Sequence, residues 1–198
     1  MPVLRDLGYL LGPARTYRPA YRRIADWLAL ESGAMLDIGC GPGWLCIEAA
    51  RGHPELDCVG IDRSPRMVAR AEANRSGTLN CTFKEMDGEH ILYPAGTFHC
   101  VVAVQSAHHW KNPDRVINEA LRVLRPAGRL VVMEAEPEAP IDEDWLHRPA
   151  GLPPSFWIRR QWRRWSCPVE SLGALCEARG VRYTVQSLGF YQVLVATP

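Results

Sequence analysis

The segment Met35-Leu-Asp-Ile-Gly-Cys-Gly-Pro-Gly-Trp44 carries the strongest indication of fold class in the chain, because it joins a short apolar run to three closely spaced glycines. The run from Ala34 to Ile38 is typical of a strand that is buried on both faces. Residues 44–51 have the pattern of a helix. Glycines between a strand and a helix allow a sharp turn and the close approach of a ligand to the helix N-terminus. The sequence therefore predicts a nucleotide-type ligand at Gly39, Gly41 and Gly43.

Predicted strands and helices alternate on both sides of this segment. Further strands are expected at 58–61, 80–84, 98–104 and 129–133, and helices at 18–30, after Ser64-Pro65 and after Asn112-Pro113. The helix after Asn112-Pro113 is expected to bury Val116, Ile117, Ala120, Leu121 and Leu124, and Gly128 to end that unit. Alternation of this kind indicates a parallel sheet with helices on both faces, since each crossover returns over the sheet with the same hand.

The C-terminal part follows a different pattern. A helix is predicted at 168–179, followed by strands at 182–188 and 191–196 that only Gly189-Phe190 separates. So short a connection cannot form a parallel crossover, so the last strand must run antiparallel to its neighbour. The predicted fold is an α/β Rossmann-like three-layer sandwich with a mostly parallel seven-stranded sheet and an antiparallel last strand. We expect a single domain over 1–198, with a helical N-terminal segment at 1–30 and an insert at 134–166.

Charge and cysteine usage limit the possible partners. The chain has 23 Lys and Arg against 22 Asp and Glu, so no overall field favours nucleic acid or an anionic membrane. The seven cysteines never form a Cys-x-x-Cys pair, which argues against a disulfide framework and a structural zinc site. We expect no bound metal and a cytoplasmic location. The first residues lack a long apolar stretch, so neither a signal peptide nor a membrane span is predicted.

Bulky Trp44 argues against a dinucleotide at the glycine turn. It occupies the position of the third glycine in the Gly-x-Gly-x-x-Gly fingerprint, which makes NAD a less favoured cofactor and a nicotinamide-dependent reductase a third choice. Asp62 and Asp87 follow the next two predicted strands. Either residue alone could cap a helix or form a turn. Together with the glycines they make an ordinary turn a less favoured explanation of this pattern.

The residues from Asp37 to Gly43 resemble the first motif of class I S-adenosylmethionine-dependent methyltransferases. The resemblance implies that Asp62 accepts hydrogen bonds from the ribose hydroxyls and that Asp87 meets the adenine amino group. It also implies that a backbone carbonyl at Gln105-Ser106 receives the methionine ammonium. The residues expected to bind S-adenosylmethionine are Asp37, Gly39, Cys40, Gly41, Gly43, Asp62, Arg63, Met67, Met86, Asp87, Gly88, Gln105 and Ser106.

Within that superfamily, the stretch from Phe98 to Leu130 is similar to the branch that includes ubiquinone and menaquinone methyltransferases. Two positions depart from the pattern of the branch. His99 stands where Asp is usual, and Ala127 replaces a usual glycine. Both positions are peripheral to the predicted cofactor site.

The expected reaction is direct in-line transfer of a methyl group to a small molecule. Such a transfer needs a base only if the acceptor is protonated. His108 and His109 are candidates for that base, because imidazole titrates near neutral pH; the alternative is that one packs and the other caps a loop. Acceptor contacts are expected from His108 to Trp110, from Tyr9 to Tyr17 and from the insert. The acceptor atom stays open, as does a non-catalytic role in binding or regulation, or methylation of a protein or nucleic acid.

The predicted insert combines acidic residues with arginines and tryptophans. A helix at about 155–165 would place Ile158, Trp162 and Trp165 on one stripe. It could form a lid that offers aromatic walls and cations to an acidic or aromatic acceptor, or it could pack on the sheet edge with its arginines neutralised by the neighbouring acids. Attachment to a membrane surface or to RNA is disfavoured, because the acidic run would repel either. A monomer or a homodimer is expected.

Overall fold

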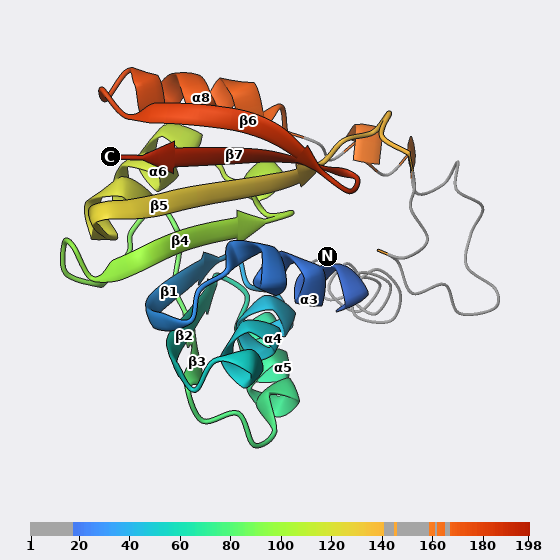
Figure 1. Cartoon of the computed structure of the whole chain (residues 1–198), viewed down its shortest axis with the longest axis vertical. Coiled ribbons are helices and arrows are strands. Elements are labelled where there is room, and N and C mark those ends of the chain that lie inside the picture. The colour runs from blue at the N-terminus through green and yellow to red at the C-terminus, as the bar shows by residue number, and fades with distance from the viewer. Residues whose placement is uncertain (1–17, 141–144, 146–158, 161, 165–166) are drawn as a thin grey trace.

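The computed structural model describes residues 18–140, 145, 159–160, 162–164 and 167–198. A seven-stranded sheet with the order β3-β2-β1-β4-β5-β7-β6 forms its centre (Figure 1). The elements are α3 (Arg18–Leu28), β1 (Ser32–Ile38), α4 (Trp44–Gly52), β2 (Glu55–Asp62), α5 (Pro65–Arg75), β3 (Cys81–Glu85), β4 (Phe98–Val104), the 3-10 turn η1 (Ala107–His109), α6 (Pro113–Val123), β5 (Leu124–Ala135), α8 (Val169–Glu177), β6 (Arg182–Leu188) and β7 (Tyr191–Thr197).

Six of the seven strands run in the same direction, and only the last strand, β7, runs the opposite way. β7 pairs antiparallel with both β5 and β6, whereas β1 pairs parallel with β2 and β4. The predicted Rossmann-like fold with an antiparallel last strand is confirmed. The order of the strands reverses between β1 and β4, and in open α/β sheets ligands bind beyond the carboxyl ends of the strands at such a point. The fold therefore places the glycine turn after β1 where a ligand is expected.

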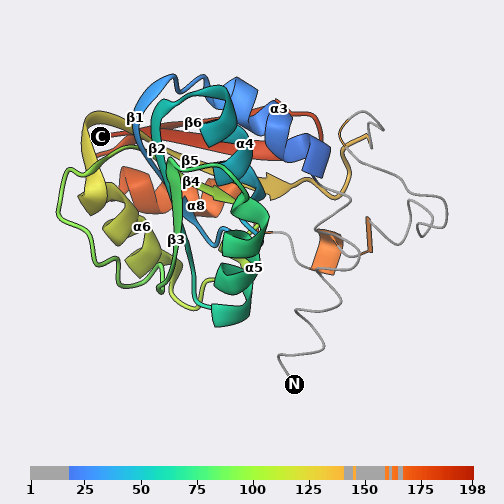
Figure 2. The same cartoon turned by 90° about the horizontal axis from the view of Figure 1, so that it is seen from below.

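Helices cover both faces of the sheet. Figure 2 shows α4 and α5 on one side of the strands and α6 on the other. Successive strand residues point to opposite faces, so Met35 packs in the core under α3 and α4 while Leu36 packs in the core under α6 and α8. Both side chains are fully buried. Burial on both faces explains why the central strands are continuous apolar runs.

Two helices begin with the caps that the sequence predicted. The Ser64 hydroxyl accepts a hydrogen bond from the backbone N–H of Met67 at 3.4 Å, and the Asn112 side-chain oxygen accepts one from Arg115 at 3.1 Å. A proline follows each cap at the first helical position, where no N–H is needed. The beginnings of α5 and α6 are thus determined locally.

The end of α6 differs from the prediction. Leu124 belongs to β5 instead of the buried face of the helix, and β5 starts directly after Val123 and runs through Gly128. Leu124 pairs with Phe98 across the sheet, so long-range strand pairing overrides the helical spacing of the apolar residues. Ala127, which stands at a usual glycine position, has a φ of 61°, a conformation that favours glycine.

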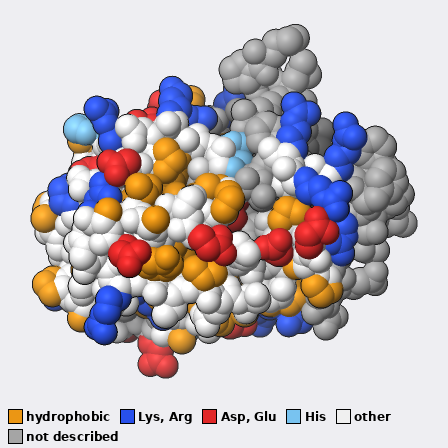
Figure 3. Space-filling view, turned by 90° about the horizontal axis from the view of Figure 1, so that it is seen from above, with side chains coloured by type: hydrophobic (Ala, Val, Ile, Leu, Met, Phe, Trp, Pro, Cys, Tyr) orange, Lys and Arg blue, Asp and Glu red, His pale blue; other side chains and the backbone are white. Residues whose placement is uncertain are grey.

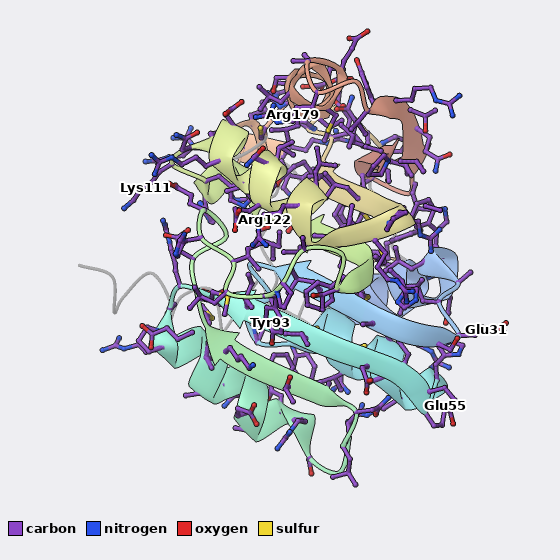
Figure 4. The ribbon with its side chains drawn as sticks, turned by 90° about the vertical axis from the view of Figure 1, so that its left-hand side faces the viewer. Glu31, Glu55, Tyr93, Lys111, Arg122 and Arg179 are labelled. Carbon is purple, nitrogen blue, oxygen red and sulfur yellow. The ribbon has the colours of Figure 1, made fainter. Side chains whose placement is uncertain are left out.

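The two ends of the parallel strands lie far apart on the molecule. In Figure 4, Glu31 and Glu55 mark the beginnings of β1 and β2 on one side, and Lys111, beyond the end of β4, lies on the other. Acidic and basic side chains are interspersed on the face shown in Figure 3, in line with the net charge of +1. No helix within the described ranges is long and apolar enough to cross a membrane.

The insert is described only in part. The predicted acceptor segment Tyr9 to Tyr17 and most of the predicted helix at 155–165 lie outside the described residues. Residues 159–160 and 162–164 are helical, and Trp145 and Trp162 are buried. Trp162 stacks on Phe190 at a centroid distance of 4.8 Å, and the Trp145 ring meets the same phenyl ring edge-on at 6.1 Å. The described part of the insert therefore packs on the turn between β6 and β7.

Candidate functional site

The glycine turn after β1 adopts a backbone that other residues rarely accept. Gly39, Gly41 and Gly43 have φ values of 76°, 52° and 81°. The backbone N–H groups of Gly39 and Cys40 both donate to the carbonyl of Ile61, at 2.8 and 3.0 Å, which ties the turn to the end of β2. Gly43 is the N-cap of α4 and makes no side-chain hydrogen bond to the first backbone N–H groups of the helix. Such N–H groups at a helix N-terminus can bind a ligand.

The end of β4 lies directly against this turn. A Cβ atom at Gly39 would lie 2.5 Å from the Cβ of Ser106, so only glycine fits there. The Ser106 hydroxyl donates a hydrogen bond of 2.7 Å to the carbonyl of Ile38. Gln105, the residue before it, has a φ of 50°, an uncommon value for a non-glycine residue and one that is frequent at functional sites. Gln105 and Ser106 are thus placed next to the glycines, as predicted.

Asp62 at the end of β2 holds two backbone segments together. Its Oδ2 accepts a hydrogen bond of 2.9 Å from the backbone N–H of Gly41, and its Oδ1 accepts one of 2.8 Å from Ser64. A carboxylate is a hydrogen-bond acceptor, so it is the kind of group that hydroxyl donors of a ligand need. A ribose offers two adjacent hydroxyl groups. The position and chemistry of Asp62 therefore fit a nucleoside ligand.

Asp37 lies behind the turn and is buried. Its carboxyl group is 3% exposed, and its Oδ2 lies 3.9 Å from the Cys46 thiol. Burial, together with the negative charge of Asp62, raises the pKa of Asp37 to about 7, although the Cys46 thiol partly opposes the shift. The structure thus places Asp37 under the cofactor site with its carboxyl group enclosed by protein.

The raised pKa of Asp37 predicts a pH-dependent stability. Between about pH 4 and about pH 7 the native protein keeps a proton that the unfolded chain releases, so this group lowers the free energy of unfolding as the pH rises. Asp37→Asn removes that penalty and is expected to raise the free energy of unfolding by about 2–4 kcal/mol at pH 8, relative to the wild type. Urea unfolding at pH 5 and pH 8 measures the difference. Exposed Asp57→Asn is the control, and equal pH dependence in Asp37→Asn and the wild type would contradict the prediction.

The segment after β3 completes the opposite wall of the candidate site. The backbone N–H of Met86 donates to the carbonyl of Asp62 at 3.1 Å, which brings this segment beside β2. A Cβ at Gly88 would lie 2.8 Å from the side chain of Ile38. Asp87 is exposed, and its Oδ1 accepts a hydrogen bond of 3.0 Å from the Glu89 N–H. The predicted adenine-side residues therefore surround the same strand ends as Asp62.

The remaining predicted residues differ in their accessibility. Arg63 is exposed, whereas Met67 and Cys40 are each 8% exposed. Burial raises the pKa of the Cys40 thiol well above its usual range, with smaller contributions from the charges of Asp37 and Asp62. Cys40 therefore behaves as a small apolar side chain, and its backbone forms part of the glycine turn.

Arg122 and Glu119 on α6 anchor the segment that follows Gly88, and the sequence analysis missed both. The Arg122 guanidinium donates to the carbonyls of Tyr93 and Ile91 at 2.9 and 2.7 Å, and Glu119 accepts the Ile91 N–H at 2.9 Å. Figure 4 shows Arg122 on α6 above the loop that carries Tyr93. Hydrogen bonds from Arg122 lower the pKa of Glu119. The pair shares one helix turn, and the i, i+3 spacing could have indicated an ion pair but not its contacts with the loop.

Glu134, near the end of β5, is a third residue that the sequence analysis missed as a site residue. Glu134 is buried; Oε1 accepts the Ala107 N–H at 2.8 Å, and Oε2 lies 2.8 Å from Nδ1 of His108. The ring of His109 meets that of His108 edge-on, with centroids 4.0 Å apart. An acid directly after an apolar strand was a usable signal for a site residue. Across the described ranges, no group of three or more His, Cys, Asp or Glu could hold a metal ion.

Comparison with known proteins adds independent evidence. Residues 36–132 match the family described as a methyltransferase domain. Demethylmenaquinone methyltransferase of Thermus thermophilus is 35% identical over 121 residues, which cover 59% of this chain and 54% of that protein. The 27-O-demethylrifamycin SV methyltransferase of Amycolatopsis mediterranei is 35% identical over 134 residues, 63% of this chain and 48% of that protein. The chain thus spans about half the length of these relatives.

A solved structure supports the fold. The crystal structure of a SAM-dependent methyltransferase from Aquifex aeolicus superposes with a TM-score of 0.68 at 20% identity, and the match covers 89% of this chain and 88% of that one. The matched family residues contain the glycine turn, Asp62 and the end of β4, which the structure brings together. On this evidence the chain belongs to the class I S-adenosylmethionine-dependent methyltransferases, in the branch that includes the demethylmenaquinone methyltransferases.

Proposed function

We propose that the protein transfers a methyl group from S-adenosylmethionine to a small-molecule acceptor by direct displacement. The observation that carries the proposal is the geometry of Asp62, whose two oxygens already hold the glycine turn and the start of the next helix. Asp62 thereby presents a carboxylate, the acceptor type that the ribose hydroxyls of an adenosyl group need, beside the glycine turn. Relatives named for small-molecule acceptors, demethylmenaquinone and 27-O-demethylrifamycin SV, support the choice of acceptor class.

In this proposal the residues around the turn divide the cofactor between them. Asp62 holds the ribose, and Met86, Asp87 and Gly88 meet the adenine. The backbone at Gly39, Gly41 and Gly43 and the Gln105-Ser106 turn accommodate the methionine portion. Arg63 and Met67 line the adenosyl side, while Asp37 and Cys40 support the turn from behind. When bound, S-adenosylmethionine supplies a methyl group on a positively charged sulfur.

The chain's own contribution to the reaction is mainly alignment. In-line displacement needs the acceptor atom, the methyl carbon and the sulfur on one line, and correct positioning alone can supply a large part of the rate enhancement. The ends of β4 and β5 lie next to the glycine turn, because Ser106 contacts Gly39 and Glu134 contacts Ala107. We therefore place the acceptor beyond η1, near His108 and His109.

Two measurements on the full chain test this function. Calorimetric titration is expected to show that S-adenosylhomocysteine binds at least about 10-fold more tightly than NADH, a difference of roughly 1.4 kcal/mol. A panel of phenols, alcohols, thiols and amines, assayed by release of S-adenosylhomocysteine, is expected to contain a methylated acceptor. Tighter binding of NADH would favour a reductase. Binding of S-adenosylhomocysteine with no turnover of any acceptor would instead favour a non-catalytic binding protein.

A further inference from the structure

Glu134 is a buried carboxylate whose two oxygens have different partners. Oε1 accepts the backbone N–H of Ala107, and Oε2 lies 2.8 Å from Nδ1 of His108. The side chain of Glu134 is 3% exposed, compared with 14% for His108. A buried carboxylate is costly unless donors satisfy it, and an ionised carboxylate can only accept. The hydrogen on the His108 side of this contact therefore belongs to Nδ1.

This contact determines which nitrogen of His108 can act as a base. With Nδ1–H donated to Glu134, the neutral imidazole carries its lone pair on Nε2. The carboxylate also stabilises the positive charge that the ring gains when Nε2 takes up a proton. The His108 side chain is 14% exposed, so the ring is not fully enclosed by protein.

The pair lies at the same edge of the sheet as the predicted cofactor residues. His108 is two residues after Ser106, whose Cβ lies 2.5 Å from the position of a Cβ at Gly39. Glu134 ends the neighbouring strand β5, in which Met133 pairs with Val104 of β4. The backbone N–H of Gln105 donates to the carbonyl of Met133 at 2.8 Å. The glycine turn, the β4 end and Glu134 thus form one continuous rigid edge.

We infer that His108 accepts the proton of an acceptor hydroxyl group, that Glu134 is the positioning residue for His108, and that the acceptor is an alcohol or a phenol. The inference rests on the proposed function. The acceptor oxygen forms a bond to the methyl carbon, and the carbon–sulfur bond breaks with its electron pair on sulfur. The hydroxyl proton moves to Nε2 of His108 and then to solvent.

The chemistry of other acceptors does not account for this pair. A thiolate or an already ionised acceptor attacks without a base, and a neutral amine attacks with its own lone pair. A hydroxyl group is the acceptor whose reactivity depends most on the removal of its proton, so it fits a histidine that a buried carboxylate orients. The titratable groups that face the pair within the described part of the chain are His109, on the same turn, and Cys167, whose pKa is raised by its own burial and by the charge of Glu134. Neither group replaces the hydrogen bond between Glu134 and His108.

The protonation pattern of the ring tests the inference without turnover. Nitrogen NMR of the histidine-labelled full chain is expected to show His108 with its hydrogen on Nδ1, the less common tautomer in solution. Glu134→Gln is expected to shift His108 toward the Nε2–H tautomer, and His108→Gln assigns the signal by removing it. A wild-type ring with its hydrogen on Nε2 would overturn the inference.

Kinetics with acceptors of graded acidity supply the second test. His108→Gln is expected to reduce kcat by about 100- to 10,000-fold for neutral hydroxyl acceptors and by less than about 3-fold for a nitrophenol that is already ionised. It should also remove the rising limb of the pH profile of kcat while S-adenosylhomocysteine affinity stays unchanged. Glu134→Gln should also reduce kcat more for neutral than for ionised acceptors, but by a smaller factor than His108→Gln. Glu134→Asp should restore part of the lost kcat, because it keeps a carboxylate.

The outcomes separate this inference from the proposed function. Turnover limited to thiol, amine or carbon acceptors would leave the methyltransferase function intact and overturn the inference. An equal loss on neutral and ionised phenols in His108→Gln would likewise overturn it, since the residue would then be structural. No turnover of any acceptor by the wild type would overturn both. His53 precedes β2 and so lies at the opposite end of the strands, and His53→Gln is the control, which we expect to retain the wild-type kcat on both kinds of phenol.

Discussion

Asp62→Ala is expected to weaken the binding of S-adenosylhomocysteine by at least about 100-fold, which corresponds to roughly 2.7 kcal/mol. The change removes the acceptor that holds the Gly41 and Ser64 N–H groups at 2.9 and 2.8 Å, and with it the proposed ribose contacts. Hydrogen bonds to a charged group contribute about 1.5–3 kcal/mol each, so the loss of several is large. Isothermal titration of the purified variant measures the affinity, and circular dichroism establishes that it is folded.

Two variants serve as comparisons for Asp62→Ala. Glu85 is the register partner of Asp62 on β3 and is exposed, so Glu85→Ala is expected to leave the affinity unchanged. Asp62→Asn keeps one side-chain oxygen and should show an intermediate loss. Wild-type affinity in Asp62→Ala would refute the placement of the cofactor at the end of β2.

Phe190→Ala is expected to lower the free energy of unfolding by about 3–5 kcal/mol. Phe190 is fully buried and lies at the turn between β6 and β7. It stacks on Trp162 at 4.8 Å and contacts the rings of Trp145 and Tyr191, so its removal leaves a cavity between the insert and the sheet. Chemical unfolding followed by tryptophan fluorescence measures the change.

The same turn supplies a control for the effect of Phe190→Ala. Leu188 is only partly buried, and Leu188→Ala is expected to lower the free energy of unfolding by less than half as much. A loss below about 1 kcal/mol in Phe190→Ala would show that the insert does not depend on this aromatic contact. The prediction also bears on the placement of the insert, because its two tryptophans contact Phe190 at the turn between β6 and β7.

The described part of the insert combines features of the two arrangements that the sequence left open. Arg159 donates to the carbonyl of Pro137 at 2.8 Å, and Arg163 pairs with Glu138 at 2.8 Å, so these arginines contact the start of the insert itself. The Arg23 guanidinium of α3 lies 5.6 Å from the Trp145 ring centroid. The contact of Arg163 with Glu138 agrees with arginines neutralised by neighbouring acids. Packing of the insert on the sheet edge and its function as a lid both stay predictions.

The sequence by itself determined the fold and the outline of the cofactor site. Glycines at 39, 41 and 43 signal a left-handed turn because other residues are strained there, and an apolar run before them signals a buried strand. The two-residue link at Gly189-Phe190 required an antiparallel last strand, since no crossover is that short. These signals are local, so they can be read without knowing which segments meet.

Only the tertiary structure decided the contacts between segments that are distant in the chain. Glu134 and His108 are 26 residues apart and meet because β4 and β5 are neighbours in the sheet. Strand pairing likewise moved Leu124 from a helix to β5, and burial beside Asp62 made Asp37 an enclosed acid. Such effects depend on desolvation and on non-local packing, which the spacing of residues along a sequence does not encode.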